Sequence, residues 1–133
     1  MALDSPWSTF RNYYLMFSSI ELILLVGLFW GGTDTALYAS FPLNAFSSAG
    51  FLSVHVSLAV LTGILAMFMV SASLKAGRMS IFTLSTTNAV FIGLAAAAGL
   101  LFYYSFSPVY SYIMALAYFG SLSSTTTALF LSI

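Results

Sequence analysis

Four long apolar runs take up most of this 133-residue chain, and they constrain its fold more than any other feature. The runs cover residues 13–31, 50–72, 80–104 and 109–131. A helix that crosses a bilayer needs about 20 mostly apolar residues, so each run is long enough to span one. Charged residues make up 5% of the chain, whereas a soluble domain carries about 25% to hydrate its surface. The sequence therefore predicts an all-α membrane protein, a single domain over residues 1–133 folded as an antiparallel bundle of four transmembrane helices.

The breaks between the runs hold residues that commonly start or end helices. "GGTD" follows the first run, "LKAGR" separates the second from the third, and "SFSP" separates the third from the fourth. Pro6 and Pro108 suit the first position of a helix, so we expect the first helix to begin ahead of its apolar run. The runs lack the alternation of β-barrel strands. The first run is also too long for a cleavable signal peptide and contains Glu21.

The three basic residues set the expected orientation. Arg11 precedes the first run, and Lys75 and Arg78 lie between the second and third. An even number of crossings separates these positions, so all three fall on one side of the membrane. Basic residues favour the cytoplasmic side, which places both termini in the cytoplasm of a multi-pass protein of the cell membrane.

Aromatic residues and one long connection mark the two membrane interfaces. We expect an inner aromatic belt of Trp7, Phe10, Tyr13 and Tyr14. The connection over residues 33–49 has no basic residue and holds apolar side chains such as Phe41 and Phe46. We expect it to lie along the outer interface or beneath a partner subunit.

A layer of polar residues is predicted at one depth in the cytoplasmic half of the membrane. With a rise of about 1.5 Å per residue, Glu21, Asn88 and the tract 121–127, which includes Ser124 and Thr125, reach a similar level. Hydroxyls and amides in such a layer commonly hydrogen-bond between helices. A carboxyl group there is costly, so Glu21 is either a structural residue bonded to Asn88 or a helix-4 hydroxyl, a partner-pairing residue, or a proton or cation site.

The single histidine of the chain, His55, lies near the outer end of the second run. Met114 is expected at nearly the same depth on the fourth. Histidine and methionine are both haem ligands, so the pair suits the axial positions of a b-type haem. The alternatives are a histidine that is hydrogen-bonded within the protein, or one that donates to a quinone or a lipid. We expect no metal site with several protein ligands.

The stretch "VHVSLAVLTGILAMFMVSASLKAGR", residues 54–78, resembles the haem-bearing helices of small four-helix membrane cytochromes of the b561 and haem A synthase type. The resemblance covers the second helix and implies that His55 ligates haem. Those families use histidines on more than one helix, so here the other ligand would come from Met114, another chain or a dimer mate. The low charge and the abundance of Ser, Tyr and Leu are similar to those of archaeal membrane proteins, which suggests an accessory subunit of an archaeal respiratory complex.

The amino-acid composition argues against several classes of function. The chain has one histidine, no cysteine and no nucleotide-binding or metalloprotease motif, so we expect no catalysis by this chain alone. Zero net charge without a basic cluster argues against nucleic acid as a partner. The leading hypothesis is a small non-catalytic subunit of a larger membrane complex, respiratory or electron-transferring, that helps to hold a haem or quinone near the outer side.

Two alternatives stay open. One is a small transporter or channel component that uses Glu21 and Asn88. The other is an envelope assembly or filament protein, since small residues recur at four-residue spacing, as in Gly93 and Ala97, and allow close helix contacts. Lipid and other membrane subunits are the expected partners, and a homo-oligomer is compatible with the same surfaces.

Overall fold

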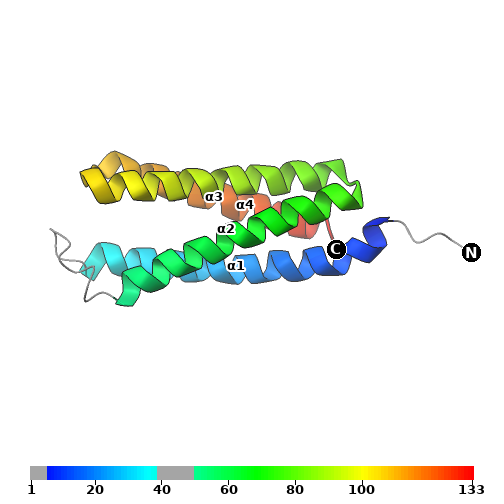
Figure 1. The fold of residues 1–133 in the computed structure, drawn as a ribbon, viewed down its shortest axis with the longest axis horizontal. Coiled ribbons are helices and arrows are strands. Elements are labelled where there is room, and N and C mark those ends of the chain that lie inside the picture. Colours follow the sequence, from blue (N-terminus) through cyan, green and yellow to red (C-terminus); the bar gives the residue numbers. More distant parts are fainter. Residues whose placement is uncertain (1–5, 39–49) are drawn as a thin grey trace, which may run out of the picture.

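The computed structural model describes residues 6–38 and 50–133, with side chains for 7–32 and 53–133. These ranges form four helices and no strand: α1 (Pro6–Tyr38), α2 (Gly50–Ala76), α3 (Met79–Ser105) and α4 (Pro108–Phe130). Figure 1 shows the four helices lying side by side along their length. Each contains a segment long and apolar enough to cross a membrane, namely Trp7–Gly32, Ser53–Ala76, Met79–Ser105 and Pro108–Phe130. For the described residues, the prediction of an all-α fold with four helices long and apolar enough to cross a membrane is confirmed.

The helix ends follow from local sequence. α1 and α4 begin at Pro6 and Pro108, because proline suits a first turn in which the backbone N–H has no partner. Gly77 has φ +70 in the turn between α2 and α3. Phe106 ends α3 in the left-handed conformation, with φ 52, and its N–H donates to the Phe102 carbonyl at 2.7 Å. Both turns are therefore short and fixed by backbone hydrogen bonds.

α1 is longer than its apolar run. It continues to Tyr38, so residues 33–38, expected to belong to the long connection, are helical. The rest of that connection, including Phe41 and Phe46, lies outside the described residues. The glycines of "GGTD" do not end the helix.

The interior of the bundle is rich in polar side chains, and its exterior is apolar. Within the described ranges, ten polar and nine apolar side chains are buried, with Glu21 and Asn88 at 0% exposure. Large apolar side chains such as Val26, Leu116 and Phe119 lie more than half exposed. A soluble protein buries mostly apolar side chains and exposes mostly polar ones. Hydrocarbon is therefore the medium that these outer surfaces fit.

Arg78 joins three helix ends. Its guanidinium carbon lies 4.8 Å from the ring centroid of Trp7, at the start of α1. Its Nη1 donates to the carbonyl oxygen of Leu131, just beyond α4, at 3.5 Å. We call this the Arg78 end of the bundle. Figure 1 shows the start of α1, the turn between α2 and α3, and the C-terminus together there.

Candidate functional site

A buried cluster centred on Glu21 joins three helices. The amide nitrogen of Asn88, on α3, donates to both carboxyl oxygens of Glu21, on α1, at 2.9 and 3.0 Å. Thr125, on α4, donates to Oε2 of the same carboxyl group at 3.1 Å. All three side chains are fully buried. The partners recorded for Glu21 are therefore neutral groups, and both of its oxygens accept hydrogen bonds.

Ser121 completes the cluster. Its hydroxyl donates to the amide oxygen of Asn88 at 2.6 Å, so both ends of that amide are used. Of the four residues predicted for the polar layer, Glu21, Asn88 and Thr125 meet, whereas Ser124 turns away and donates to the Gly120 carbonyl at 2.8 Å. Ser121 lies four residues before Thr125 and therefore on the same helix face. This spacing favours Ser121 over Ser124 as a member of the cluster.

A second pair of polar side chains lies nearer the Arg78 end. The hydroxyls of Tyr14, on α1, and Ser85, on α3, are 2.8 Å apart. Ser85 donates its hydrogen to the Ile81 carbonyl, so Tyr14 is the donor within the pair. The expectation that Tyr14 belongs to an interfacial belt is wrong, because it is 0% exposed, whereas its neighbour Tyr13 is 57% exposed.

His55 packs against two glycines of α1. Its Nδ1 lies 3.5 Å from the position that a Cβ on Gly31 would take, and its Cε1 lies 3.3 Å from that of Gly32. The backbone of Leu28 is a polar group close to the ring. Nδ1 itself is buried and has no hydrogen-bond partner. Because neither glycine has a side chain, the imidazole ring packs directly against the backbone of α1.

Met114 has a different neighbour. Its sulfur lies 3.2 Å from the position of a Cβ on Gly99, so it fills a notch on α3. His55 thus lies against glycines of α1, whereas Met114 lies against a glycine of α3. Their pairing as haem ligands stays a prediction.

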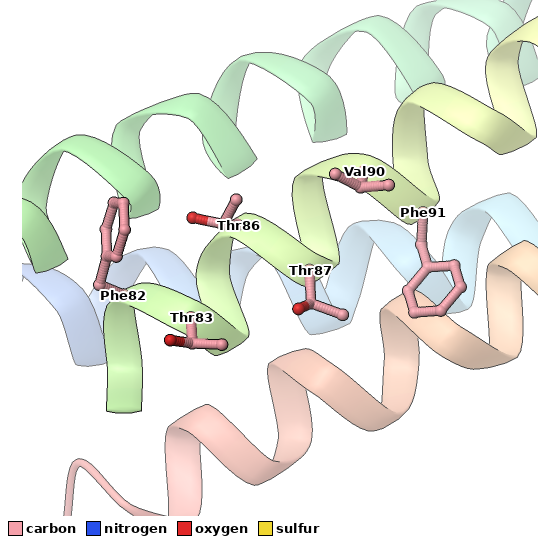
Figure 2. Close-up of a pocket in the computed structure, with 6 residues that line it drawn as sticks. All are labelled: Phe82, Thr83, Thr86, Thr87, Val90 and Phe91. Carbon is pink, nitrogen blue, oxygen red and sulfur yellow. The ribbon is translucent and has the colours of Figure 1, made fainter. Parts of the chain in front are cut away.

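A groove lies along α3, away from the Glu21 cluster. Its volume is about 300 Å³, and its lining comes entirely from that helix: Phe82, Thr83, Thr86, Thr87, Val90 and Phe91. Figure 2 shows the two phenylalanine rings at opposite ends, with the threonines and Val90 between them. One helical turn further, a Cβ on Gly93 would meet nothing within 4 Å. The short side chains of threonine, valine and glycine thus leave a shallow surface on this face of α3, beside and between two aromatic rings.

No group of three His, Cys, Asp or Glu side chains that could hold a metal ion occurs within the described ranges. Comparison of the chain with protein-family models, with curated proteins and with solved structures finds no match.

Proposed function

We propose that this chain is a small, non-catalytic integral membrane subunit that packs into a larger complex through the grooved face of α3. The groove between Phe82 and Phe91 carries the proposal. Helices associate in lipid through small residues that let backbones approach and through hydroxyls that bond between helices. The groove offers Thr87 and Val90, with the open surface at Gly93 beyond them. The Thr83 hydroxyl donates to the Met79 carbonyl of its own helix, and the Thr86 hydroxyl is buried. A transmembrane helix of another subunit fits such a surface.

The short connections support the same function. Gly77 and Arg78 join α2 to α3, and Phe106 and Ser107 join α3 to α4. These two connections are too short to build a water-exposed site of their own. Among the described residues, the sides of the helices offer the larger surface for recognition.

The proposed topology is an antiparallel bundle with both termini in the cytoplasm. The contacts of Arg78 with Trp7 and with the Leu131 carbonyl support it, since they draw the two ends of the described chain to the basic turn. The positive-inside rule then assigns the Arg78 end to the cytoplasm and His55 to the outer half of the membrane.

A respiratory complex is the proposed setting, on the resemblance of residues 54–78 to haem-bearing helices. The purified complex should show a Soret band that His55→Ala removes, with Met114→Leu testing the second ligand. A complex that contains cytochrome subunits but keeps its band in His55→Ala would retain the accessory role and exclude His55 as a ligand.

Site-directed cross-linking tests the docking face, and the chain suits it because it contains no cysteine. Val90→Cys places a thiol in the groove, and Val26→Cys is the matched control, since the two valines are 64% and 63% exposed. With a photoactivatable thiol reagent in native membranes, Val90→Cys should cross-link to an oxidase or cytochrome subunit, identified by mass spectrometry, and Val26→Cys should not. Equal yields from both positions, or a product containing two copies of this chain alone, would contradict the proposal.

The buried carboxyl group of Glu21 favours a second candidate, a small transporter or channel component. Vesicles containing the chain would then show a proton or cation flux that Glu21→Gln abolishes while the protein still assembles. Normal flux in that variant would exclude this candidate. A filament protein would instead form large assemblies on its own in detergent.

A further inference from the structure

Among the described residues, no positively charged side chain contacts Glu21, and Lys75, near the end of α2, is exposed. The partners recorded for its oxygens are Asn88 and Thr125, both neutral. Arg11 lies ten positions earlier on α1, about 15 Å away along the helix axis. Arg78 is at the end of the bundle with Trp7. An unpaired carboxylate in a low-dielectric interior is costly, and binding a proton removes that cost.

The hydrogen bonds around Glu21 can serve both of its protonation states. With Glu21 ionised, the Asn88 nitrogen donates to both carboxyl oxygens and its oxygen accepts from Ser121. With a proton on Oε1, the carboxyl group needs an acceptor. Turning the Asn88 amide over by 180° supplies one, because its oxygen then faces Oε1. Its nitrogen then donates to the Ser121 hydroxyl, which changes from donor to acceptor, while Thr125 still donates to Oε2. Of the four hydrogen bonds, only the one from the Asn88 nitrogen to Oε2 is not replaced.

A series of buried polar groups leads from the Arg78 end of the bundle toward Glu21. Tyr14 and Ser18 precede it on the same face of α1 and are 0% exposed, and Ser85 of α3 bonds to Tyr14. All three lie toward the Arg78 end. In the other direction the next buried side chains of α1, α3 and α4 are apolar, Leu25 at 2%, Ala98 at 3% and Ala117 at 1%. On α2, Thr62 is buried there and donates its hydroxyl to the Leu58 carbonyl. Buried hydroxyl groups outside the cluster are thus more numerous on the Arg78 side of Glu21.

Few other titratable groups face this site. On α1 the titratable neighbour is Tyr14. α3 and α4 contribute the neutral side chains of Asn88, Ser121 and Thr125. The buried side chains of the described part of α2 do not titrate: Thr62, Ala66, Met69, Ser73 and Ala76.

We propose that Glu21 is a proton-binding site whose protonation turns the Asn88 amide over. The proton exchanges with the Arg78 end of the bundle and not with the opposite end. This site acts within one chain and does not depend on the partner proposed for the groove of α3.

Infrared difference spectroscopy on the purified chain in lipid vesicles tests the site. Acidification should produce a carboxylic acid C=O band together with a change in the side-chain amide band of an asparagine. Glu21→Gln, which keeps the shape and can still hydrogen-bond, should remove both signals and leave the helix content unchanged by circular dichroism. Asp34→Asn, a second acidic position, is the control and should keep both. Persistence of the signals in Glu21→Gln, or an equal response to Na⁺ at constant pH, would overturn the proposal.

Sidedness is tested by a rapid pH jump outside sealed vesicles in which the chain has one orientation. The carboxylic acid band should follow the jump promptly when the Arg78 end faces outward, and only after the interior has equilibrated when it faces inward. Leu25→Ser adds a hydroxyl to the apolar layer and should make the two responses alike. Equal prompt responses in the unmodified chain would overturn one-sided exchange.

Discussion

The ring of Phe91 occupies the space in which any residue larger than glycine at position 120 would place its Cβ. Three ring atoms lie 2.7 Å from that Cβ position. Gly120 thus lets α4 approach the aromatic side chain at one end of the α3 groove. The fit of these two residues fixes how the two helices pack at that level.

Gly120→Ala should destabilise the bundle, because the added methyl group overlaps the ring in a packed contact. We expect a loss of about 1–3 kcal/mol, the usual cost of overpacking. Gly93→Ala is the matched control on α3, where a Cβ would meet nothing within 4 Å. Reversible unfolding in mixed detergent micelles measures both. Equal stability of the two variants would contradict the close contact.

Asn88→Leu should cost about 1–3 kcal/mol, the penalty for leaving a buried polar group without its partner. It removes the hydrogen bonds that the amide nitrogen makes to both carboxyl oxygens of Glu21. Adding Glu21→Leu should recover part of that loss, since replacing both partners by apolar side chains removes the unsatisfied group. The same unfolding assay gives the coupling between the two sites. Purely additive effects would show that the two side chains do not interact.

Tyr14→Phe should lower stability by about 0.6 kcal/mol, with about 1.7 kcal/mol as the upper end for a hydrogen bond between membrane helices. The variant removes the hydroxyl that donates to Ser85 and leaves the buried ring in place. Tyr13→Phe is the control, because Tyr13 is 57% exposed. A larger loss from Tyr13→Phe than from Tyr14→Phe would reverse the assignment of the buried tyrosine.

Depth in the membrane could be predicted from the sequence, but direction around each helix could not. A rise of about 1.5 Å per residue brings Glu21, Asn88 and Thr125 to one level. It does not distinguish Ser121 from Ser124, or Tyr14 from Tyr13, because those choices depend on which neighbouring helix each side chain faces.

The end of α1 shows a second limit of sequence reading. Glycine weakens a helix by about 1 kcal/mol relative to alanine, which made "GGTD" a reasonable end. The helix nevertheless runs through both glycines and continues to Tyr38, beyond the apolar span that ends at Gly32.

Cysteine accessibility in intact cells tests the membrane topology most directly. Ser80→Cys, near the start of α3, and Ser105→Cys, at its other end, introduce thiols at two exposed positions of a chain that has none of its own. A membrane-impermeant maleimide should label Ser105→Cys from outside and should label Ser80→Cys only after permeabilisation, with lipid-facing Leu116→Cys unlabelled in both cases. Labelling of both serine positions from the same side, or of Ser80→Cys alone from outside, would contradict the account.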